Sequence, residues 1–451
     1  MAGKYEIDMC NGKLFSGIIK CAIPLMLTNI LQLLYNAVDI IVVGRYVGSD
    51  ALAAVGSTSS LINMIVNIFL GLSVGATVVV SQYIGSKNFQ KAHDGCHTAI
   101  LTSIILGVFL AILGNILCRP MLLLMGTPAD VIEQSVLYMR IYFLGMPAFM
   151  VMTFGSALMR TVGDTKRPLY VFSISGILNV VLNLIFVLQF KLGVAGVAIA
   201  TIVSQYVSAI FITFALVNTD GYIKIDISSL KIDNFSLKEM IKKGLPAGIQ
   251  SFVFSGSNVI IQSSINSFGS IVMAGSSAAA NIEGFVYTAL NTFYHVAITF
   301  SGQNFGAKKY KRIDKTLLIS LSLVIAIGVT ASTVVYMFGE TLLGIYAPGN
   351  AEAISYGMIR FKCILLPYFV CGIMEVFVGA IRGIGISIIP MLISILGVCG
   401  VRIMWIFTVF AQHKTLETLF VSYLISWSAT IFCLVIAYFI LRKKLFKKES
   451  Q

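Results

Sequence analysis

The sequence contains few charged residues for its length. Asp, Glu, Lys and Arg make up 11% of the 451 residues, whereas a typical soluble domain contains about 25%. Hydrophobic residues make up 57%, and the mean hydropathy is +0.91. So few polar side chains cannot cover the apolar surface of a chain of this size in water. The composition therefore excludes an ordinary soluble domain and favours a protein embedded in lipid.

Motifs of common enzymes and metal sites are also missing. There is no GxxxxGK[ST] loop, no GxSxG turn and no HExxH pair. The eight cysteines form no CxxC pair and are interpreted as small buried thiols. His93 and His97 have the i,i+4 spacing of metal ligands, but only Asp94 is near them, which favours a solvated helix end. We therefore expect no enzyme, no cofactor and no metal, and the energy must come from an ion gradient, a partner or the substrate's own gradient.

Long apolar runs dominate what is present. A membrane-spanning helix needs about 20 mainly apolar residues. The first run has no cleavage site after a short core, so we expect a span and not a signal peptide. Twelve runs qualify, at about 15–43, 51–80, 96–117, 131–157, 168–189, 194–217, 241–266, 272–301, 316–338, 353–379, 388–410 and 417–441.

The distribution of positive charge predicts the orientation of these spans. The net charge is +13, but Lys and Arg lie mainly in short segments between the apolar runs, which argues against nucleic-acid binding. Alternate segments that include both termini hold 23 of the 32 Lys and Arg, and the other segments hold four. Because cytoplasmic loops are enriched in Lys and Arg, we expect a multi-pass protein of the plasma (inner) membrane with both termini in the cytoplasm.

The two halves of the sequence resemble each other at an offset of 220–222 residues. Six spans is an even number, so both copies cross the membrane in the same direction, as a parallel repeat. We predict an all-α integral membrane protein with twelve transmembrane helices in two six-helix bundles, related by a pseudo-two-fold axis along the membrane normal. The bundles are 1–217 and 241–451, the latter with a basic cytoplasmic tail, and 218–240 is a cytoplasmic connecting loop. Matching pairs include Pro24 with Pro246, Gln82 with Gln303, Arg140 with Arg360, Pro147 with Pro367, and Arg160 with Arg382.

Asp39 is the sharpest candidate for a functional residue within a span. An ionisable side chain at membrane depth costs roughly 2.5–3.5 kcal/mol, which makes it a functional candidate by default. Tyr35 lies one helical turn earlier, and Asn179 and Asn183 have the same spacing in the fifth span. A carboxylate with amide and hydroxyl oxygens can bind a proton or Na⁺, and the alternative is a polar contact that holds helices together. The matching positions of the second half are Ile261, Val401 and Trp405.

Other polar residues in the spans are candidates for a substrate cavity. The two acids could attract a cationic substrate or titrate, and the alternative is an ion pair with Arg402, Arg360 or Lys362. The histidine is more often a hydrogen-bonded core residue than a ligand. Arg140 and Arg360 are interpreted as structural because they are repeat partners. The cavity candidates are Glu283, Glu375, His295 and Arg402.

Short motifs along nearly the whole chain resemble one family. The stretch Tyr35-Asn-Ala-Val-Asp39, followed by Val43-Gly-Arg45, resembles the multidrug and toxic compound extrusion (MATE) transporters. The pattern is most similar to the DNA-damage-inducible (DinF-like) bacterial branch. Further matching elements are Gly71-Leu-Ser-Val-Gly75, Gln82-Tyr-Ile-Gly85, Ala157-Leu-Met-Arg160 and Gly302-Gln-Asn-Phe-Gly306.

The resemblance implies sites as well as a fold. It places the family's ion site of the N-terminal bundle at Asp39, with Tyr35, Asn179 and Thr201 nearby, and a bend at Pro24. Members with two acids in this site have Asp where this chain has Asn183. The missing carboxylate leaves the coupling ion open. Some members have a Glu in the seventh span. This chain has no Glu there, and Phe254 lies near the matching position.

The favoured hypothesis is a secondary active efflux transporter. It would export organic cations, drugs and toxic metabolites by H⁺ or Na⁺ antiport with alternating access, as a monomer in contact with membrane lipid. One alternative is a lipid-linked oligosaccharide flippase of the same superfamily, which would favour an arginine-lined cavity for pyrophosphate. Another is a receptor or scaffold that transports nothing, against which the repeat and the asymmetric acid argue.

Overall fold

The computed structural model describes residues 5–447, except the side chains at positions 49, 50, 57, 60, 446 and 447. The described residues form helices and no β-strand; η marks short 3-10 or π-helical segments. The first half contains α1 (Leu14–Tyr46), α2 (Ser49–Gly85), α3 (Phe89–Leu124), α4 (Ile132–Leu144), α5 (Met146–Thr161), α6 (Lys166–Leu184), η1 (Ile185–Gln189) and α7 (Gly193–Val217). The second half contains η2 (Ile227–Ser229), α8 (Asn234–Asn266), α9 (Ser270–Gly306), α10 (Tyr310–Met337), α11 (Gly339–Tyr346), α12 (Ala351–Arg360), η3 (Phe361–Leu365), α13 (Tyr368–Gly383), α14 (Ile388–Ser394), η4 (Ile395–Gly400), α15 (Val401–Trp405), η5 (Ile406–Phe410) and α16 (Leu416–Lys447).

Twelve long helical segments coincide with the twelve predicted apolar runs. Within the described part of the chain, eight helices are long and apolar enough to be single spans, and two bent pairs raise the number to ten. The pairs α4–α5 and α12–α13 bend by 48° and 41°, next to Pro147 and Pro367. Proline lacks an N–H group and clashes with the preceding turn, so these repeat-related prolines account for the bends. The other two segments, α8 and α9, are 33 and 37 residues long but are not among the helices that qualify as spans by hydropathy.

Contacts divide the chain into two compact units. Ile23–Gly248 forms the N-terminal unit with the residues before Lys13, and the residues from Ile249 onward form the C-terminal unit with Lys13–Ala22. Both α1 and α8 therefore contribute to both units. The bundle boundaries predicted from the repeat, at 217 and 241, stay a prediction, since contacts and repeat divide the chain by different criteria.

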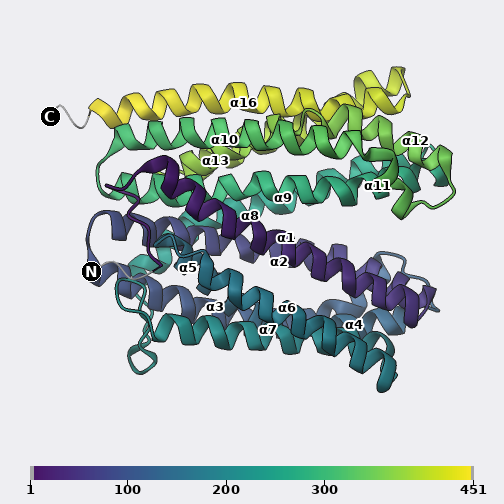
Figure 1. The fold of residues 1–451 in the computed structure, drawn as a ribbon, viewed down its shortest axis with the longest axis horizontal. Helices are drawn as coiled ribbons and strands as arrows, with labels where there is room; N and C mark the ends of the chain where they lie inside the picture. The colour runs from purple at the N-terminus through teal and green to yellow at the C-terminus, as the bar shows by residue number, and fades with distance from the viewer. Residues whose placement is uncertain (1–4, 448–451) are drawn as a thin grey trace. The chain divides into compact units, whose positions relative to one another are not determined.

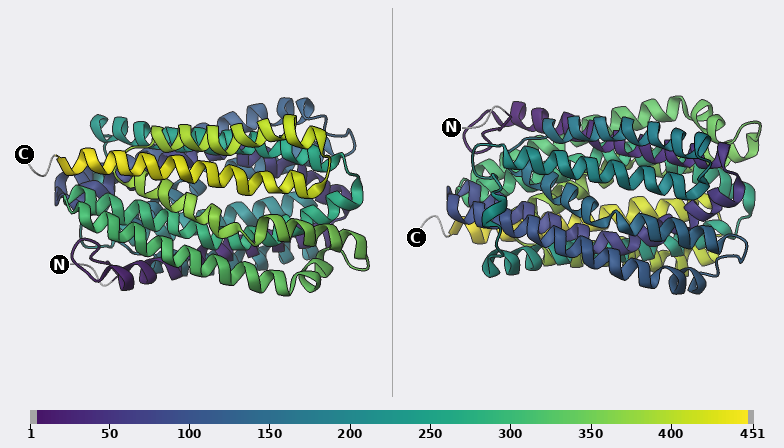
Figure 2. Two further views of the ribbon diagram at one scale, coloured as in Figure 1. Left: turned by 90° about the horizontal axis from the view of Figure 1, so that it is seen from above. Right: turned by 90° about the horizontal axis from the view of Figure 1, so that it is seen from below.

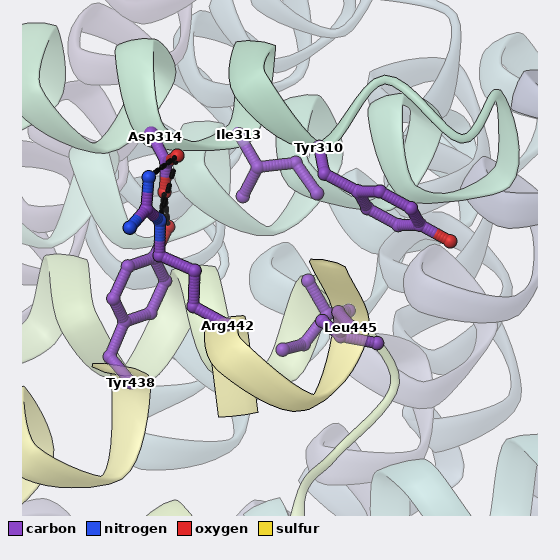
Figure 3. A pocket seen from close by; sticks show the side chains of 7 residues that line it. Tyr310, Ile313, Asp314, Tyr438, Arg442 and Leu445 are labelled. Carbon is purple, nitrogen blue, oxygen red and sulfur yellow. Dashed lines mark hydrogen bonds and ion pairs between the residues drawn. The ribbon is translucent and has the colours of Figure 1, made fainter. Parts of the chain in front are cut away.

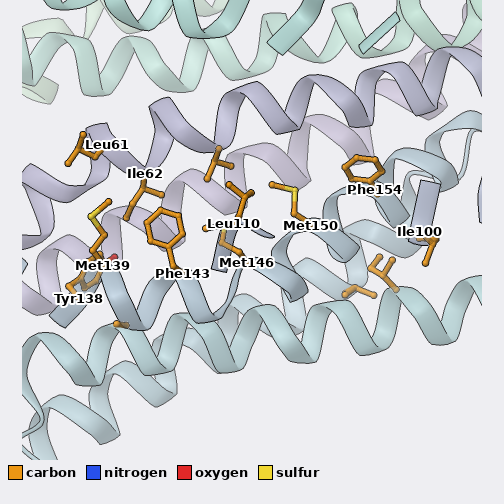
Figure 4. Close-up of a cluster of buried hydrophobic side chains, with 14 of the residues drawn as sticks. Leu61, Ile62, Ile100, Leu110, Tyr138, Met139, Phe143, Met146, Met150 and Phe154 are labelled. Atoms are coloured by element: carbon orange, nitrogen blue, oxygen red, sulfur yellow. The ribbon is translucent and has the colours of Figure 1, made fainter. Parts of the chain in front are cut away.

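Figure 1 labels the long helices along the chain. The core of the N-terminal unit includes large side chains from α2–α5 (Figure 4) and further apolar side chains from α1, α6 and α7. Met139, Met146 and Phe143 are fully buried there. The ring of Phe143 lies so close to Gly114 of α3 that a Cβ at this glycine would come within 2.2 Å of it. The small residue thus sets how closely α3 and α4 approach, since protein interiors leave few voids.

Two glycine pairs bring α2 against the first half of α8. The sequences Gly71-Leu-Ser-Val-Gly75 and Gly244-Leu-Pro-Ala-Gly248 both have the GxxxG spacing. A Cβ at Gly71 would lie 2.2 Å from the backbone of Gly248, and one at Gly244 would lie 2.7 Å from the carbonyl of Gly71. Small residues at this spacing let helix backbones pack closely in membranes. This contact attaches the start of α8 to the N-terminal unit.

The connecting segment is shorter than the predicted loop at 218–240, because α8 begins at Asn234. The carboxylate of Asp233 accepts a hydrogen bond of 2.8 Å from the backbone N–H of Ser236. An acid in this position satisfies an unpaired N–H group at a helix start and favours the helix. Hydrogen bonds from Ser236 lower the pKa of Asp233, and those from Ser228 lower the pKa of Asp226.

His97 attaches this segment to α3. Its Nδ1 lies 3.2 Å from the carbonyl oxygen of Ser229, and its Nε2 accepts a hydrogen bond of 3.2 Å from the backbone N–H of Asp226. The hydroxyl of Thr98 accepts a further bond of 2.9 Å from the N–H of Asp233. His97 is fully buried, so the prediction of a solvated helix end was wrong for this residue. The reason is that the segment after α7 folds back over the start of α3.

The C-terminal unit is organised around α9. This helix packs against α10, α12 and α13, and α16 packs against α13 and the π-helical segments η3 and η4. Figure 2 shows α16, in yellow, running along the green helices of this unit. The π-helical segments follow Arg360 directly and lie on both sides of α15, which carries Arg402. Such irregular turns often occur at functional sites because they redirect side chains.

Candidate functional site

Asp39 lies at the centre of a polar cluster in the N-terminal unit. It is 9% exposed and is provided by α1. Its Oδ1 accepts a short hydrogen bond from the amide of Asn183, and its Oδ2 accepts one of 3.4 Å from the hydroxyl of Thr201. The amide of Asn183 also donates to Oδ1 of Asn179 at 3.2 Å, and Asn179 donates to Thr201 at 3.5 Å. Four of the five predicted residues of the cation-coupling cluster are thus joined in one network.

Local features of α6 place its two asparagines. They are four residues apart, so they project from the same face of the helix. The π-helical segment η1 begins two residues after Asn183. Tyr35 lies over Gly176 of the same helix, and its hydroxyl donates a hydrogen bond of 3.3 Å to the carbonyl of Ser173. Tyr35 is therefore one helical turn from Asp39 and bonded to α6 instead of to the carboxylate.

The cluster contains oxygen atoms with capacity for another ligand. The Oδ1 of Asn183 is buried and has no hydrogen-bond partner among the described residues. Carboxylate, amide and hydroxyl oxygens are the donors that hard cations prefer. A proton on Asp39 would equally well be held there, since a protonated carboxyl can donate to an amide oxygen. The cluster can therefore hold either a proton or a small cation.

The repeat-related place in the C-terminal unit is apolar. Ile261, which matches Asp39, is buried. Trp405, which matches Asn183, donates its indole N–H to the carbonyl of Thr418 at 2.8 Å. The polar cluster is therefore specific to the first half of the chain, as the sequence predicts.

Glu283 forms a buried ion pair in the C-terminal unit. Its carboxylate accepts hydrogen bonds from Nε of Arg360 at 3.1 Å and from Nη2 at 2.9 Å. Arg360 also donates to the hydroxyl of Ser276 at 3.0 Å and lies over the ring of Phe420. Of the alternatives open for Glu283, the geometry is that of the ion pair, so its charge is balanced within the protein.

Glu375 differs from Glu283. It is buried in α13, and no hydrogen bond or ion pair joins it to another described residue. Its carboxylate interacts electrostatically with the cation of Arg382, and with Tyr287 and Tyr294. A buried acid without a fixed partner is costly unless it is protonated or paired with a ligand. Glu375 is thus the predicted cavity residue with the most freedom to meet a cation.

Arg402 lies among aromatic rings. Its guanidinium is 4.0 Å from the ring centre of Tyr423 and 5.6 Å from that of Trp427, and its Nε donates to Ser426 at 2.9 Å. The ring centre of Trp427 lies 5.4 Å from that of Tyr368. Tyr368 in turn lies 6.2 Å from Tyr287. Aromatic faces attract cations, so this group of rings is suited to organic cations as well as to arginine.

Arg382 was not among the predicted site residues. It is buried, and it donates hydrogen bonds to the hydroxyl of Tyr294 and, at 2.7 Å, to Oε1 of Gln250. The ring of His295 lies edge-on to Tyr294, with 5.0 Å between ring centres. The repeat match of Arg160 with Arg382 was the available signal, but the predicted spans, which end at 379 and resume at 388, placed Arg382 in a loop.

Pro24 lies one residue after the position where α1 passes from one unit to the other. The hydroxyl of Thr28 donates a hydrogen bond of 2.8 Å to the carbonyl of Pro24. Its repeat partner Pro246 lies two residues before the corresponding passage in α8. Both helices that connect the units therefore contain a proline at the connection.

Comparisons of the sequence and of the structure with known proteins point to the same family. The MatE family model matches residues 24–185 and again 246–408, which reproduces the predicted repeat. The probable multidrug resistance protein YoeA of Bacillus subtilis is 28% identical over 405 residues, which cover 88% of this chain and 87% of YoeA. The probable multidrug resistance protein NorM of Thermotoga maritima is 24% identical, with 86% and 83% covered.

Solved structures share the whole fold. One is described as the outward-facing conformation of a multidrug resistance MATE family transporter of the MOP superfamily, with a TM-score of 0.90, 20% identity and 100% of both chains covered. Another is a MOP superfamily transporter from Pyrococcus furiosus, with a TM-score of 0.88, 20% identity and 97% of both chains covered. The twelve-helix fold predicted from the sequence is confirmed. With both halves matched by its family model, the chain belongs to the MATE family.

Proposed function

We propose that this protein is a secondary active efflux transporter, which exports organic cations, drugs and toxic metabolites in exchange for H⁺ or Na⁺. The observation that carries this proposal is the buried carboxylate of Asp39, which accepts hydrogen bonds from the amide of Asn183 on α6 and the hydroxyl of Thr201 on α7 and has an apolar counterpart in the other half. A site that must be filled and emptied once per cycle needs one titratable or cation-binding group. Alternating access would then expose this group to each side of the membrane in turn.

Substrate class follows from the C-terminal unit and from relatives. Among the described residues, Glu375 has an electrostatic neighbour in Arg382 but no hydrogen-bonded or ion-paired partner. The rings of Tyr287, Tyr368 and Trp427 form a connected aromatic group. An acid beside aromatic rings suits a hydrophobic cation. YoeA and NorM are named as multidrug resistance proteins, and a Shewanella oneidensis relative with 23% identity is named an FAD transporter. We propose that small organic cations are the principal substrates.

The flippase alternative is less favoured. A lipid-linked pyrophosphate would need arginines free to bind it. Arg360 is paired with Glu283, and Arg382 and Arg402 are bonded to neighbouring side chains. These groups are therefore engaged within the protein, while Glu375 would repel pyrophosphate.

We also propose the setting of this activity. The bias of Lys and Arg supports a location in the plasma (inner) membrane with both termini in the cytoplasm. We propose that the protein functions as a monomer, because all residues of the Asp39 cluster come from one chain.

Fluorescent-cation efflux from proteoliposomes tests the proposal. A proton gradient and a Na⁺ gradient would be imposed separately, with several cationic dyes. We expect one of them to accelerate efflux, because only the coupling ion exchanges with substrate. If neither gradient drives efflux of any dye by protein that remains folded, the exporter proposal is wrong, and lipid-linked substrates become the next to test.

A further inference from the structure

His97 of α3 holds the middle of the connecting segment, residues 218–233, through both of its ring nitrogens. The carbonyl oxygen of Ser229, 3.2 Å from Nδ1, can only accept a hydrogen bond, so Nδ1 carries a proton. The backbone N–H of Asp226, 3.2 Å from Nε2, can only donate, so Nε2 carries none. The two contacts together therefore select the neutral ring with its proton on Nδ1.

A second proton on this ring would break one of the two contacts. It would bind to the lone pair of Nε2, which would then point an N–H group at the N–H group of Asp226. The side chain of His97 is fully buried, so both donors would be left without an acceptor, which is unfavourable for buried polar groups. Protonation of His97 and attachment of the segment therefore exclude each other.

The charged neighbours of His97 oppose one another. Among the described residues, the groups that act electrostatically on this ring are His93 and Asp94 of α3 and Asp226 of the segment. None of them comes from α2, α4 or α5, the helices that pack against α3. The ring of His93 lies 4.0 Å away between ring centres, and a charge on it disfavours a second one. The two acids favour a charged ring, although Asp94 is already paired with Lys231 at 3.5 Å. His97 can therefore change its charge near neutral pH, as histidine ordinarily does.

The connecting segment is attached to α3 on both sides of this contact. Before it, Tyr222 stacks on Phe89 with 4.3 Å between ring centres. After it, the backbone N–H of Asp233 donates a hydrogen bond of 2.9 Å to the hydroxyl of Thr98. Neither of these two contacts involves a histidine. A proton on the imidazole would therefore free the middle of the segment and leave its ends in place.

The matching place in the C-terminal unit is held differently (Figure 3). Leu318, which matches His97, is exposed. One turn earlier on α10, Asp314 accepts hydrogen bonds from the hydroxyl of Tyr438 at 2.9 Å and from Nε of Arg442 at 3.0 Å. A carboxylate and a guanidinium thus join the start of α10 to α16, where the N-terminal unit uses an imidazole. The histidine contact is therefore specific to the half that leads into the connecting segment.

We propose that His97 is a pH-sensitive clasp. Its neutral ring holds residues 226–229 of the connecting segment on α3, and its protonated ring releases them. Because this segment joins α7 to α8, the release lengthens the free chain between the two repeats. The clasp goes beyond the proposed transport function, since it requires neither a substrate nor the Asp39 cluster.

Hydrogen–deuterium exchange of the purified full-length protein in detergent tests the clasp. The exchange of amides in residues 218–233 would be followed at pH of about 7.5 and about 5.5, one unit on either side of the ordinary pKa of histidine. Each rate would be divided by the intrinsic chemical exchange rate at that pH, which gives a protection factor. H97Q keeps a donor and an acceptor but does not titrate, and H97R is a permanent cation without an acceptor. The control H413Q removes an exposed histidine of the C-terminal unit.

We expect the protection of residues 226–229 in the wild type and in H413Q to fall about tenfold between the two pH values. The reason is that a free imidazole with a pKa of about 6.5 is about ten times as often charged as neutral at the lower pH. H97Q should lose this change, whatever its protection at the higher pH, and H97R should lack the protection at both. A wild type that keeps its protection at the lower pH would overturn the proposal. So would a pH response of H97Q equal to that of the wild type, and this comparison decides even if H97R does not fold.

Discussion

At the scale of single residues, the two halves of this protein differ most where charge is buried. Arg140 and Arg360 are repeat partners, yet Arg140 is exposed and Arg360 is paired with Glu283. The difference follows from one position, because Glu283 matches Ile62 in the first half. We interpreted both arginines as structural. The geometry supports this role for Arg360, which balances the buried charge of Glu283, whereas Arg140 has no such acid beside it among the described residues.

Removing one partner of this pair should be far more damaging than removing both. Arg360→Met would leave the Glu283 carboxylate buried without its cation, and we expect a loss of about 3–5 kcal/mol of stability. The double variant Arg360→Met with Glu283→Leu should recover most of that loss. Arg140→Met, the matched control at an exposed position, should change little. Thermal unfolding in detergent measures all four proteins, and equal unfolding temperatures for Arg360→Met and the wild type would contradict this account.

Part of the candidate site could be predicted from the sequence. Asp39 stands out because charged residues are rare in spans. Asn179 and Asn183 stand out because amides are rare there too, and their spacing of four residues puts both on one helix face. The partner of Glu283 could not be predicted, since Arg360, Lys362 and Arg402 were equally plausible from spacing alone. Arg382 was missed because a loop prediction says nothing about burial.

At the scale of helices, proline and glycine determine most of the departures from straight, regular spans. The bends at Pro147 and Pro367 follow from a missing N–H group and were visible in the sequence. The π-helical segments beside Arg360 and Arg402 were not predicted, because one inserted residue per turn leaves the apolar pattern almost unchanged. The early start of α8 depends on Asp233, a capping residue that precedes the apolar run.

The glycine contact between α2 and α8 gives a direct prediction. In Gly244→Leu a side chain would meet the backbone of Gly71 and Leu72 at 2.7 Å. We expect a lower unfolding temperature and faster proteolysis of the 218–233 segment, because the start of α8 would leave α2. Gly256→Leu is the control on the same helix, where an added Cβ meets nothing within 4 Å. If both variants behave like the wild type, the close approach of α2 and α8 is wrong.

At the scale of the whole molecule, the repeat is the feature that the sequence predicts best. Matching residues 220–222 positions apart predicted two equivalent halves, and the family model matches each half once. The prediction succeeds because prolines and charged residues within membrane spans are few and easily aligned. What the repeat alone could not predict is how α1 and α8 divide between the two compact units, since that depends on contacts.

The prolines at these divisions are expected to act as hinges. Pro24→Ala restores a backbone N–H group to α1, which should stiffen the helix where it passes between units. We expect slower efflux with an unchanged or higher unfolding temperature, and the same for Pro246→Ala. Pro120→Ala is the control, since Pro120 lies inside α3 and away from both connections. Normal efflux by both hinge variants would argue against bending at these positions.

The most direct test of the central claim is gradient-driven dye efflux by Asp39→Asn in proteoliposomes. The account predicts that this variant unfolds at the wild-type temperature but no longer responds to the proton or Na⁺ gradient, because the amide can neither titrate nor balance a cation. Glu375→Gln, measured alongside, should keep its response to the gradient. An Asp39→Asn protein that still couples efflux to either gradient would contradict the assignment of Asp39 as the coupling site.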